Sequence, residues 1–220
     1  MVRGVCCLRH LRGLFFIYKK YHMNNLDIRK YIRQKRKNLT DSEQQSKSVA
    51  IFNNSLQCKK LRFSKTIAGY FPHAGEASPL HILEQAHTQH KTCLFPVLKA
   101  KPSQSLYFFP HQLGAALTYN RFGIAEPRKT PRNIKPTWSI DVILMPLVAF
   151  DETGNRLGMG GGFYDRTLAF LKHRSYWKKP HLIGIAYEFQ KIDNLKSNNW
   201  DIPLNEIITE KKVYCFNKKI

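Results

Sequence analysis

The chain has 220 residues, of which 43% are hydrophobic and 23% are charged, proportions typical of a folded globular protein of one domain. Its 36 Lys and Arg against 15 Asp and Glu give a formal net charge of +21, so its surface should attract nucleotides, nucleic acids or polyanionic metabolites. No segment approaches the ~20 consecutive apolar residues of a membrane-spanning helix, which argues against a membrane protein.

Residues 1–24 form a basic extension with no acidic residue. The apolar stretch 14–18 is too short for a secretory signal and is followed by Lys19 and Lys20 instead of a small-residue cleavage site. The extension is either an organelle-targeting segment or sequence upstream of a true start at Met23. We expect a single domain over residues 25–220.

The cysteines at positions 6, 7, 58, 93 and 215 are odd in number, and no two have the spacing of a zinc site. We therefore expect free thiols, a reducing compartment and a cytoplasmic location. Cys93 is predicted to be a buried thiol instead of a nucleophile, because no neighbouring feature would activate it.

Two helices are predicted before the first strand. Residues 27–39 have apolar positions near helical spacing among many Lys and Arg, which indicates a basic amphipathic helix. Thr40 followed by Glu43 is the pattern of a capping box, and it predicts a second helix with Val49, Phe52 and Leu56 on its inner face.

Short apolar runs then alternate with helical stretches. A helix capped by Ser78 and Pro79 follows the first run, and another follows a glycine-rich loop after residue 157. Because the runs are apolar throughout, we predict a three-layer α/β/α sandwich with a largely parallel central sheet. Residues 100–138 are expected to be mainly a long connection. The predicted strands cover residues 66–71, 92–98, 105–109, 141–150, 181–189 and 207–216.

The most informative segment is this glycine-rich loop, where Gly158, Gly160, Gly161 and Gly162 follow a buried strand and precede a helix. It matches neither the Walker A pattern nor the dinucleotide-binding fingerprint. Glycines let the backbone approach an anion and direct several N–H groups at it, and Arg156 can add a bidentate donor. We predict a phosphate-binding loop; the alternative is a glycine-rich packing turn.

Asp165 is an acidic residue beside this presumed phosphate site. A carboxylate there is unfavourable unless a cation lies between it and the phosphate, so Asp165 is a candidate Mg²⁺ ligand. The alternative is an acidic residue that interacts with the dipole at a helix N-terminus.

The segment Phe150-Asp-Glu-Thr-Gly-Asn-Arg-Leu-Gly-Met-Gly-Gly-Gly-Phe-Tyr-Asp-Arg166 resembles the signature of the 5-formyltetrahydrofolate cyclo-ligase family. The resemblance extends over nearly all of residues 25–216, including segments 70–76, 123–127, 140–146 and 201–209. It implies a sheet like that of sugar-phosphate isomerases and CoA transferases.

The resemblance also implies an activity. Members of the family use ATP and Mg²⁺ to convert 5-formyltetrahydrofolate into 5,10-methenyltetrahydrofolate, ADP and phosphate. The expected partners are these small molecules, the folate in polyglutamylated form, with neither a membrane nor a nucleic acid, and the expected state is a monomer.

Roles for individual residues follow from the same resemblance. Arg156 and Arg29 would be catalytic, Asp165 and Asp201 would bind the metal, and Phe71 and Glu76 would bind the folate together with Gly160, Gly161, Gly162 and Phe163. Asn25 stands where relatives carry a lysine, and Met159 and Phe163 replace tyrosines. The implied ATP-binding residues are Asn25, Arg29, Arg156, Leu157, Gly158, Met159, Gly160, Gly161, Gly162, Phe163 and Tyr164.

Three other interpretations stay open or are set aside. A nucleic-acid-binding module would suit the pI of about 9.9, although no recognition motif accompanies the basic residues. An isomerase or CoA-transferase relative would share the fold. Glu84, His87 and His90 have metal-ligand spacing but are predicted to form a solvated helix face, and His73 is predicted to be an ordinary loop histidine near the folate pocket.

Overall fold

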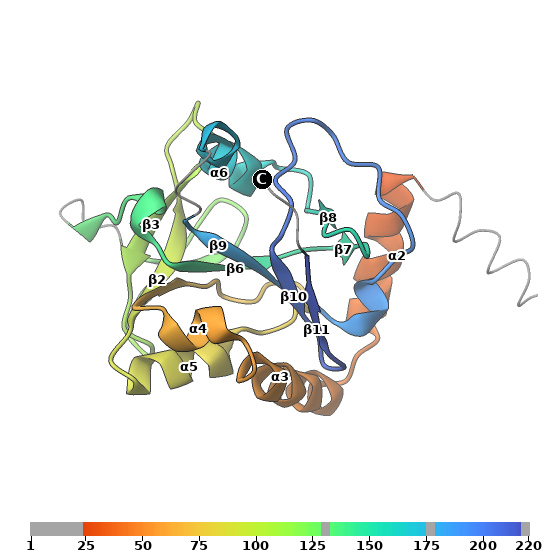
Figure 1. The fold of residues 1–220 in the computed structure, drawn as a ribbon, viewed down its shortest axis with the longest axis horizontal. Helices are drawn as coiled ribbons and strands as arrows, with labels where there is room; N and C mark the ends of the chain where they lie inside the picture. The colour runs from red at the N-terminus through yellow and green to blue at the C-terminus, as the bar shows by residue number, and fades with distance from the viewer. Residues whose placement is uncertain (1–23, 129–132, 175–178, 217–220) are drawn as a thin grey trace, which may run out of the picture.

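The computed structural model describes residues 24–128, 133–174 and 179–216, built around a seven-stranded sheet of order β11-β10-β9-β6-β1-β2-β3 (Figure 1). The pairs β10/β9, β9/β6, β6/β1 and β1/β2 are parallel, and the edge strands β11 and β3 are antiparallel to their neighbours. The strands are β1 (Thr66–Ala68), β2 (Thr92–Leu98), β3 (Leu106–Pro110), β6 (Val142–Pro146), β9 (His181–Ile185), β10 (Glu206–Ile208) and β11 (Val213–Cys215).

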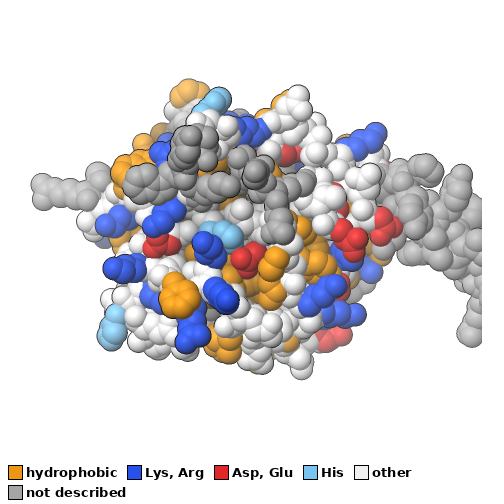
Figure 2. Space-filling view, in the orientation of Figure 1, with side chains coloured by type: hydrophobic (Ala, Val, Ile, Leu, Met, Phe, Trp, Pro, Cys, Tyr) orange, Lys and Arg blue, Asp and Glu red, His pale blue; other side chains and the backbone are white. Residues whose placement is uncertain are grey.

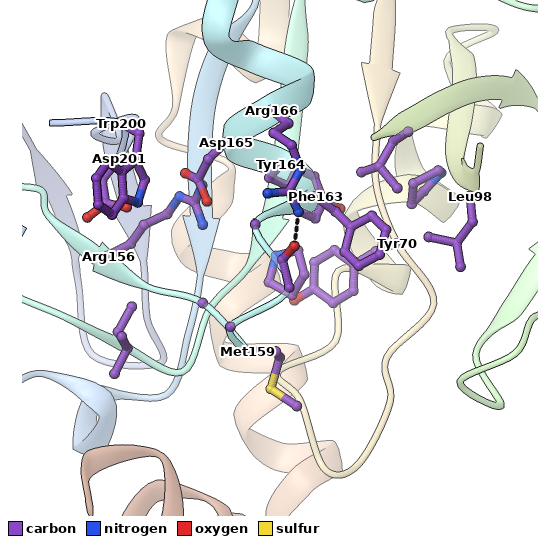
Figure 3. A pocket seen from close by; sticks show the side chains of 18 of the residues that line it. Tyr70, Leu98, Arg156, Met159, Phe163, Tyr164, Asp165, Arg166, Trp200 and Asp201 are labelled. Atoms are coloured by element: carbon purple, nitrogen blue, oxygen red, sulfur yellow. Dashed lines mark hydrogen bonds and ion pairs between the residues drawn. The ribbon is translucent and has the colours of Figure 1, made fainter. Parts of the chain in front are cut away.

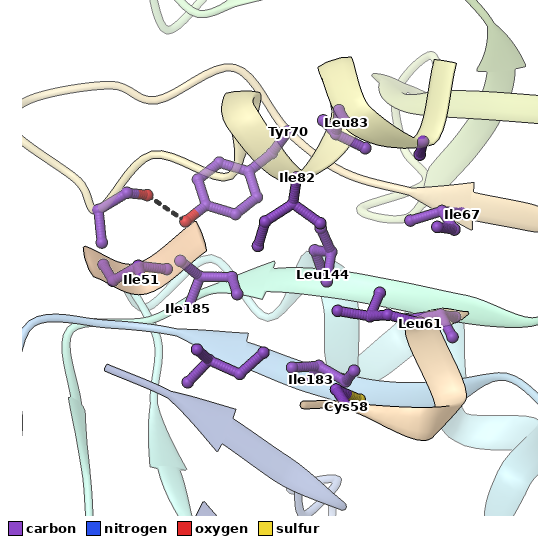
Figure 4. Packing of buried hydrophobic residues seen from close by; sticks show 14 of the residues in the cluster. Ile51, Cys58, Leu61, Ile67, Tyr70, Ile82, Leu83, Leu144, Ile183 and Ile185 are labelled. Carbon is purple, nitrogen blue, oxygen red and sulfur yellow. Dashed lines mark hydrogen bonds between the residues drawn. The ribbon is translucent and has the colours of Figure 1, made fainter. Parts of the chain in front are cut away.

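The central strands are buried on both faces. Along β6, Val142 and Leu144 belong to one hydrophobic cluster, whereas Ile143 and Met145 belong to the other. Helices α3 (Asp41–Ser55), α4 (Lys59–Phe63) and α5 (Leu80–Thr88) cover the first face (Figures 1 and 4). The short α6 (Phe163–Leu168) and the 3-10 helix η3 (Ala169–His173) lie over the second. The predicted α/β architecture is confirmed.

Helix α2 (Asn25–Lys37) lies beside the sheet instead of over it (Figure 1). Its buried Ile28 and Ile32 pack near Leu157 against the two-stranded sheet of β7 (Ala149–Phe150) and β8 (Arg156–Leu157). Asn24 caps the helix by accepting hydrogen bonds from two backbone N–H groups of its first turn. Helix α2 is therefore fixed against the strand pair that leads into the glycine loop.

The predicted long connection contains a β-hairpin that the sequence did not predict. Strands β4 (Leu117–Tyr119) and β5 (Ala125–Pro127) are antiparallel. The buried carboxylate of Glu126 anchors the hairpin, because Oε1 accepts hydrogen bonds from the Leu98 backbone N–H at 2.9 Å and from Asn120 Nδ2 at 2.8 Å. The 3-10 helix η2 (Thr137–Ser139) ends the same connection.

Helix α3 starts with the predicted capping box of Thr40 and Glu43. Of the three residues predicted for its inner face, Phe52 packs against the core, but the prediction was wrong for the other two. Ile51 is buried, whereas Val49 and Leu56 are 42% and 59% exposed. The inner face is instead centred on Ile51, with the short polar side chains of Ser48 and Ser55 at the buried positions beside it.

Several strand ends also differ from expectation. The run 207–216 is the β10–β11 hairpin, and the run 181–189 leaves the sheet after Ile185 before the 3-10 helix η4 (Glu188–Gln190). Strand β1 ends at Ala68, and the backbone then turns toward the cavity described below. Among the described residues, none of the helices is both long and apolar enough to cross a membrane.

Candidate functional site

A cavity of about 1160 Å³ opens at the carboxyl ends of the parallel strands (Figure 3). Tyr70 and Phe71 reach it just after β1, Leu98 at the end of β2, and Pro146 at the end of β6. This edge of an open α/β sheet is where such folds bind their ligands. The glycine loop, α2 and the β4–β5 hairpin form its other walls.

The glycine loop runs from β8 to α6, and its backbone geometry requires glycine at two positions. Gly160 has a φ of +103° and Gly162 a φ of +63°. A Cβ on Gly162 would lie 2.9 Å from Arg166 Nη1, so a side chain there would also push the Arg166 guanidinium aside. The Arg166 guanidinium donates to the carbonyl of Gly161 (Figure 3). Arg29 Nε donates to the carbonyl of Gly158 at 2.9 Å. Two arginines therefore fix the loop from opposite sides.

Arg156 and Asp165 form an ion pair across this loop, with Nη2 2.5 Å from Oδ1 (Figure 3). The Arg156 side chain is 4% exposed, and within the described residues its buried Nε has no hydrogen-bond partner. A guanidinium that is buried, paired on one side and unsatisfied on another retains a donor for an incoming anion.

Asp201 lines the same part of the cavity as Asp165. Its Oδ2 accepts from the Asn198 backbone N–H at 2.7 Å. In the part of the chain described, Asp165 Oδ2 and Asp201 Oδ1 accept no hydrogen bond, and no three Asp, Glu, His or Cys groups gather into a metal site of their own. The residues fit Mg²⁺, which commonly takes one or two carboxylates and completes its shell with phosphate oxygens and water.

The other end of the cavity is aromatic and contains one buried acid. Phe71 stacks on Phe95 with centroids 4.3 Å apart, and both rings meet the edge of His111. The Glu76 side chain is 10% exposed, and burial raises its pKa although Arg36 acts in the opposite direction. This end offers a flat apolar wall beside a hydrogen-bonding carboxylate.

The cavity brings together every residue that the sequence assigned to a site: Asn25, Arg29, Phe71, Glu76, Asp165, Asp201 and residues 156–164. His73 lines it too. Outside the cavity, Cys93 is a buried thiol as predicted, and burial raises its pKa. Glu84 and His87 are exposed on α5, and His90 is exposed in the turn after that helix.

Sequence reasoning missed several lining residues. Phe122 in the β4–β5 hairpin contacts Phe163 edge to face with centroids 5.9 Å apart, and Tyr70, Arg166 and Trp200 also face the cavity. The segment 123–127 belongs to the resemblance described above, and it was the available signal for the hairpin. Nothing in the local pattern distinguishes Phe122 or Trp200 from ordinary loop aromatics.

The fold and the cavity define an α/β protein that binds its ligands at the carboxyl edge of a mostly parallel sheet. The sequence profile of the 5-formyltetrahydrofolate cyclo-ligase family matches residues 22–210. The chain therefore belongs to this family of enzymes.

Named relatives agree. The chain is 38% identical to the 5-formyltetrahydrofolate cyclo-ligase of Haemophilus influenzae, over 82% of this chain and 95% of that protein. It is 36% identical to that of Escherichia coli, over 83% and 98%. The structure of Aquifex aeolicus 5,10-methenyltetrahydrofolate synthetase superposes with a TM-score of 0.73 at 29% identity, covering 90% of this chain and 95% of that one.

Proposed function

We propose that the protein converts 5-formyltetrahydrofolate to 5,10-methenyltetrahydrofolate with hydrolysis of ATP to ADP and phosphate. The observation that carries the proposal is that one cavity joins a glycine loop held by Arg29 to an aromatic recess containing Glu76. Its volume of about 1160 Å³ exceeds the usual range of ~300–1,000 Å³ for a single ligand, which suits two substrates in contact.

The two ends of the cavity suit different ligands. Backbone N–H groups of the loop, Arg29 and Arg156 suit the triphosphate, because positioned donors and positive charge are what phosphoryl transfer requires. Phe71 can face a flat ring, and Glu76 can accept hydrogen bonds from amino and ring N–H groups of a pterin. The formyl group would then lie between the ends, next to the glycine loop.

In the proposed reaction the side chains only position the two substrates, and the bonds form and break between the substrates themselves. The formyl oxygen attacks the γ-phosphorus, the bond to the β-phosphate oxygen breaks, and ADP leaves. N10 then attacks the formyl carbon and loses its proton, and the carbon–oxygen bond breaks to release phosphate. No side-chain nucleophile is needed, since the phosphorylated oxygen is the leaving group.

Asp165 and Asp201 are the residues that would hold Mg²⁺ in this proposal. When bound, the ion would neutralise charge on the triphosphate. Arg156 holds Asp165 in place through the ion pair, and its buried Nε has no hydrogen-bond partner among the described residues.

One chain supplies all of these groups, which supports action as a monomer. Figure 2 shows the basic side chains of the visible face lying among acidic and apolar ones, a distribution that favours general attraction of anionic metabolites over a continuous nucleic-acid track.

The test is a spectrophotometric assay of methenyl product with purified protein, 5-formyltetrahydrofolate, ATP and Mg²⁺. Product should form only when all are present. Arg29→Met should raise the KM for ATP by about tenfold or more, since it removes the contact with Gly158. Lys30→Met, on the exposed neighbouring position of α2, is the matched control. A folded wild-type protein that makes no product would refute the proposal, and salt-sensitive RNA binding without turnover would favour the nucleic-acid alternative.

A further inference from the structure

Arg36 is a buried arginine on an otherwise basic and exposed stretch of α2. Its side chain is 4% exposed, its Nη2 donates to the carbonyl of Leu147, and its Nη1 lies 3.9 Å from Glu76 Oε1. Its Nε is buried and, within the described residues, has no hydrogen-bond partner. Burial lowers the pKa of Arg36, and the negative charge of Glu76 opposes this effect. Burying a charged guanidinium costs free energy, so packing alone does not explain why an arginine occupies this position.

The turn that carries Glu76 rests on Arg36. Ala74 and Gly75 both have positive φ, and a Cβ on Gly75 would lie 3.2 Å from Arg36 Cβ. The turn continues into Ala77, whose carbonyl accepts from the Tyr70 hydroxyl at 2.5 Å (Figure 4). The backbone N–H of His73 donates to Glu76 Oε2 at 3.3 Å. Both carboxylate oxygens of Glu76 therefore face a positive or donating group while the side chain still lines the cavity.

We infer that Arg36 is a positioning residue for the folate substrate: it supports the turn that carries Glu76 and places a positive charge beside it, so that the carboxylate is oriented to accept hydrogen bonds from the pterin. The inference rests on the proposed function, and it assigns a role to a residue that does not line the cavity. At 3.9 Å the pair is an electrostatic contact longer than a hydrogen bond, so the acceptor positions of Glu76 remain available to a ligand.

Arg36 also connects the two ends of the cavity. The carbonyl of Leu147, to which it donates, accepts a second hydrogen bond from Gln190 Nε2 at 2.7 Å and directly precedes the strand pair leading to the glycine loop. Arg29, two helical turns earlier on α2, holds Gly158 of that loop. One helix therefore contacts both the proposed pterin acid and the proposed ATP loop.

The test measures binding of 5-formyltetrahydrofolate by calorimetry without ATP, in wild type and in Arg36→Met, with kinetics alongside. Arg36→Met should weaken folate binding about threefold or more at neutral pH, because Glu76 loses the positive charge 3.9 Å away that holds the carboxylate in place. The KM for folate should rise while kcat and the KM for ATP change less than about twofold. Arg36→Lys should restore most of the affinity because it keeps the charge. Arg33→Met, exposed on the same helix, should bind as wild type does.

A pH series separates positioning from a merely structural role. Without Arg36 the pKa of Glu76 should rise further, so the ratio of wild-type to variant affinity should fall as the pH is raised from about 6 to about 9. Tyr70, Tyr164 and Tyr187 also face this acid, and burial raises the pKa of each, so they stay neutral in this range. His73 lines the same cavity, and the series is therefore repeated in His73→Asn. In a Glu76→Gln background, the pH-dependent effect of Arg36→Met should vanish.

The outcomes are distinguishable. A wild-type protein that neither binds nor converts 5-formyltetrahydrofolate would remove the proposed function. A wild type that binds it, with Arg36→Met binding equally well at every pH, would overturn the inference alone. If Arg36→Met does not fold, Arg36→Lys decides: near-normal affinity supports the role of the charge, and a loss of about threefold or more at every pH contradicts it.

Discussion

Arg156 and Asp165 pair at 2.5 Å across the glycine loop, and this contact joins the start of β8 to the first turn of α6. In the proposed function Asp165 would have two roles, because the carboxylate proposed to bind the metal ion also neutralises a buried guanidinium. Asp201 pairs with no arginine of the described residues; it accepts from the backbone and side-chain nitrogens of Asn198. The two predicted metal ligands therefore differ in what their loss should do.

Asp165→Asn should lower both activity and stability. We expect at least a hundredfold loss of kcat, with the unfolding free energy lower by about 1–3 kcal/mol because Arg156 loses its charged partner. Asp201→Asn should lose activity and require more Mg²⁺ at nearly unchanged stability. Assays over a Mg²⁺ series and urea unfolding test this, and equal stability losses in the two variants would contradict the distinction.

Gly162→Ala should impair ATP binding in addition to lowering stability. The φ of +63° costs a non-glycine residue about 1–2 kcal/mol. The added Cβ would also lie only 2.9 Å from Arg166 Nη1 and would push the guanidinium away from the loop. Gly114→Ala is the matched control, because Gly114 has a φ of +88° with open space around it and lies outside the cavity. Both variants should be destabilised, but only Gly162→Ala should raise the KM for ATP. If Gly114→Ala raises it equally, loop geometry is not the cause.

Phe122→Ala should weaken substrate binding without destabilising the protein. The ring is 51% exposed, so its removal costs little packing, yet it contacts Phe163 at the cavity rim. We expect the KM for one of the two substrates to rise about three- to tenfold. This corresponds to a loss of about 0.7–1.4 kcal/mol of binding free energy, which is typical of an aromatic contact. Tyr119→Ala on the same hairpin, 76% exposed and outside the cavity, is the control. Steady-state kinetics should separate the two variants, and identical kinetics would exclude a role for the hairpin.

The sequence predicted those elements whose structure depends on neighbouring residues along the chain. Strand β2 spans the predicted 92–98 because an apolar run is bounded by polar residues, and α3 begins at the predicted cap because Thr40 and Glu43 satisfy each other. The glycine loop was recognisable because its residues are consecutive.

Features that depend on distant contacts could not be predicted in this way. Arg36 follows the pattern of a solvated basic helix, and only Leu147 and Glu76, far along the chain, make it a buried residue. Glu126 similarly reads as a loop acid until the Leu98 N–H approaches it. In both cases a buried charge is held by partners from other elements, and sequence periodicity carries no information about those partners.

A partly buried acid away from the cavity, Glu206, should govern stability in acid. Glu206 begins β10, where Oε2 accepts from Cys58 Sγ at 3.0 Å and Oε1 pairs with His181 Nε2 at 2.9 Å. Burial opposes ionisation of Glu206, but the hydrogen bonds from His181 and Cys58 outweigh burial and lower its pKa. Burial and the same carboxylate raise the pKa of Cys58 to about 12, so its thiol stays protonated as the donor.

A carboxyl group with a lowered pKa in the folded state stabilises the protein above its unfolded-state pKa, and this contribution is lost as the pH falls through the folded-state pKa. Glu206→Gln should therefore reduce the unfolding free energy by about 1–2 kcal/mol at neutral pH and flatten its decline between about pH 5 and about pH 3. Glu84→Gln removes a similar contact, His81 Nδ1 to Glu84 Oε2 at 3.0 Å, on an exposed helix face, and should change stability by less than about 0.5 kcal/mol. Urea unfolding midpoints across this pH range are the measurement. Parallel pH curves for Glu206→Gln and wild type would show that Glu206 does not titrate differently in the folded state.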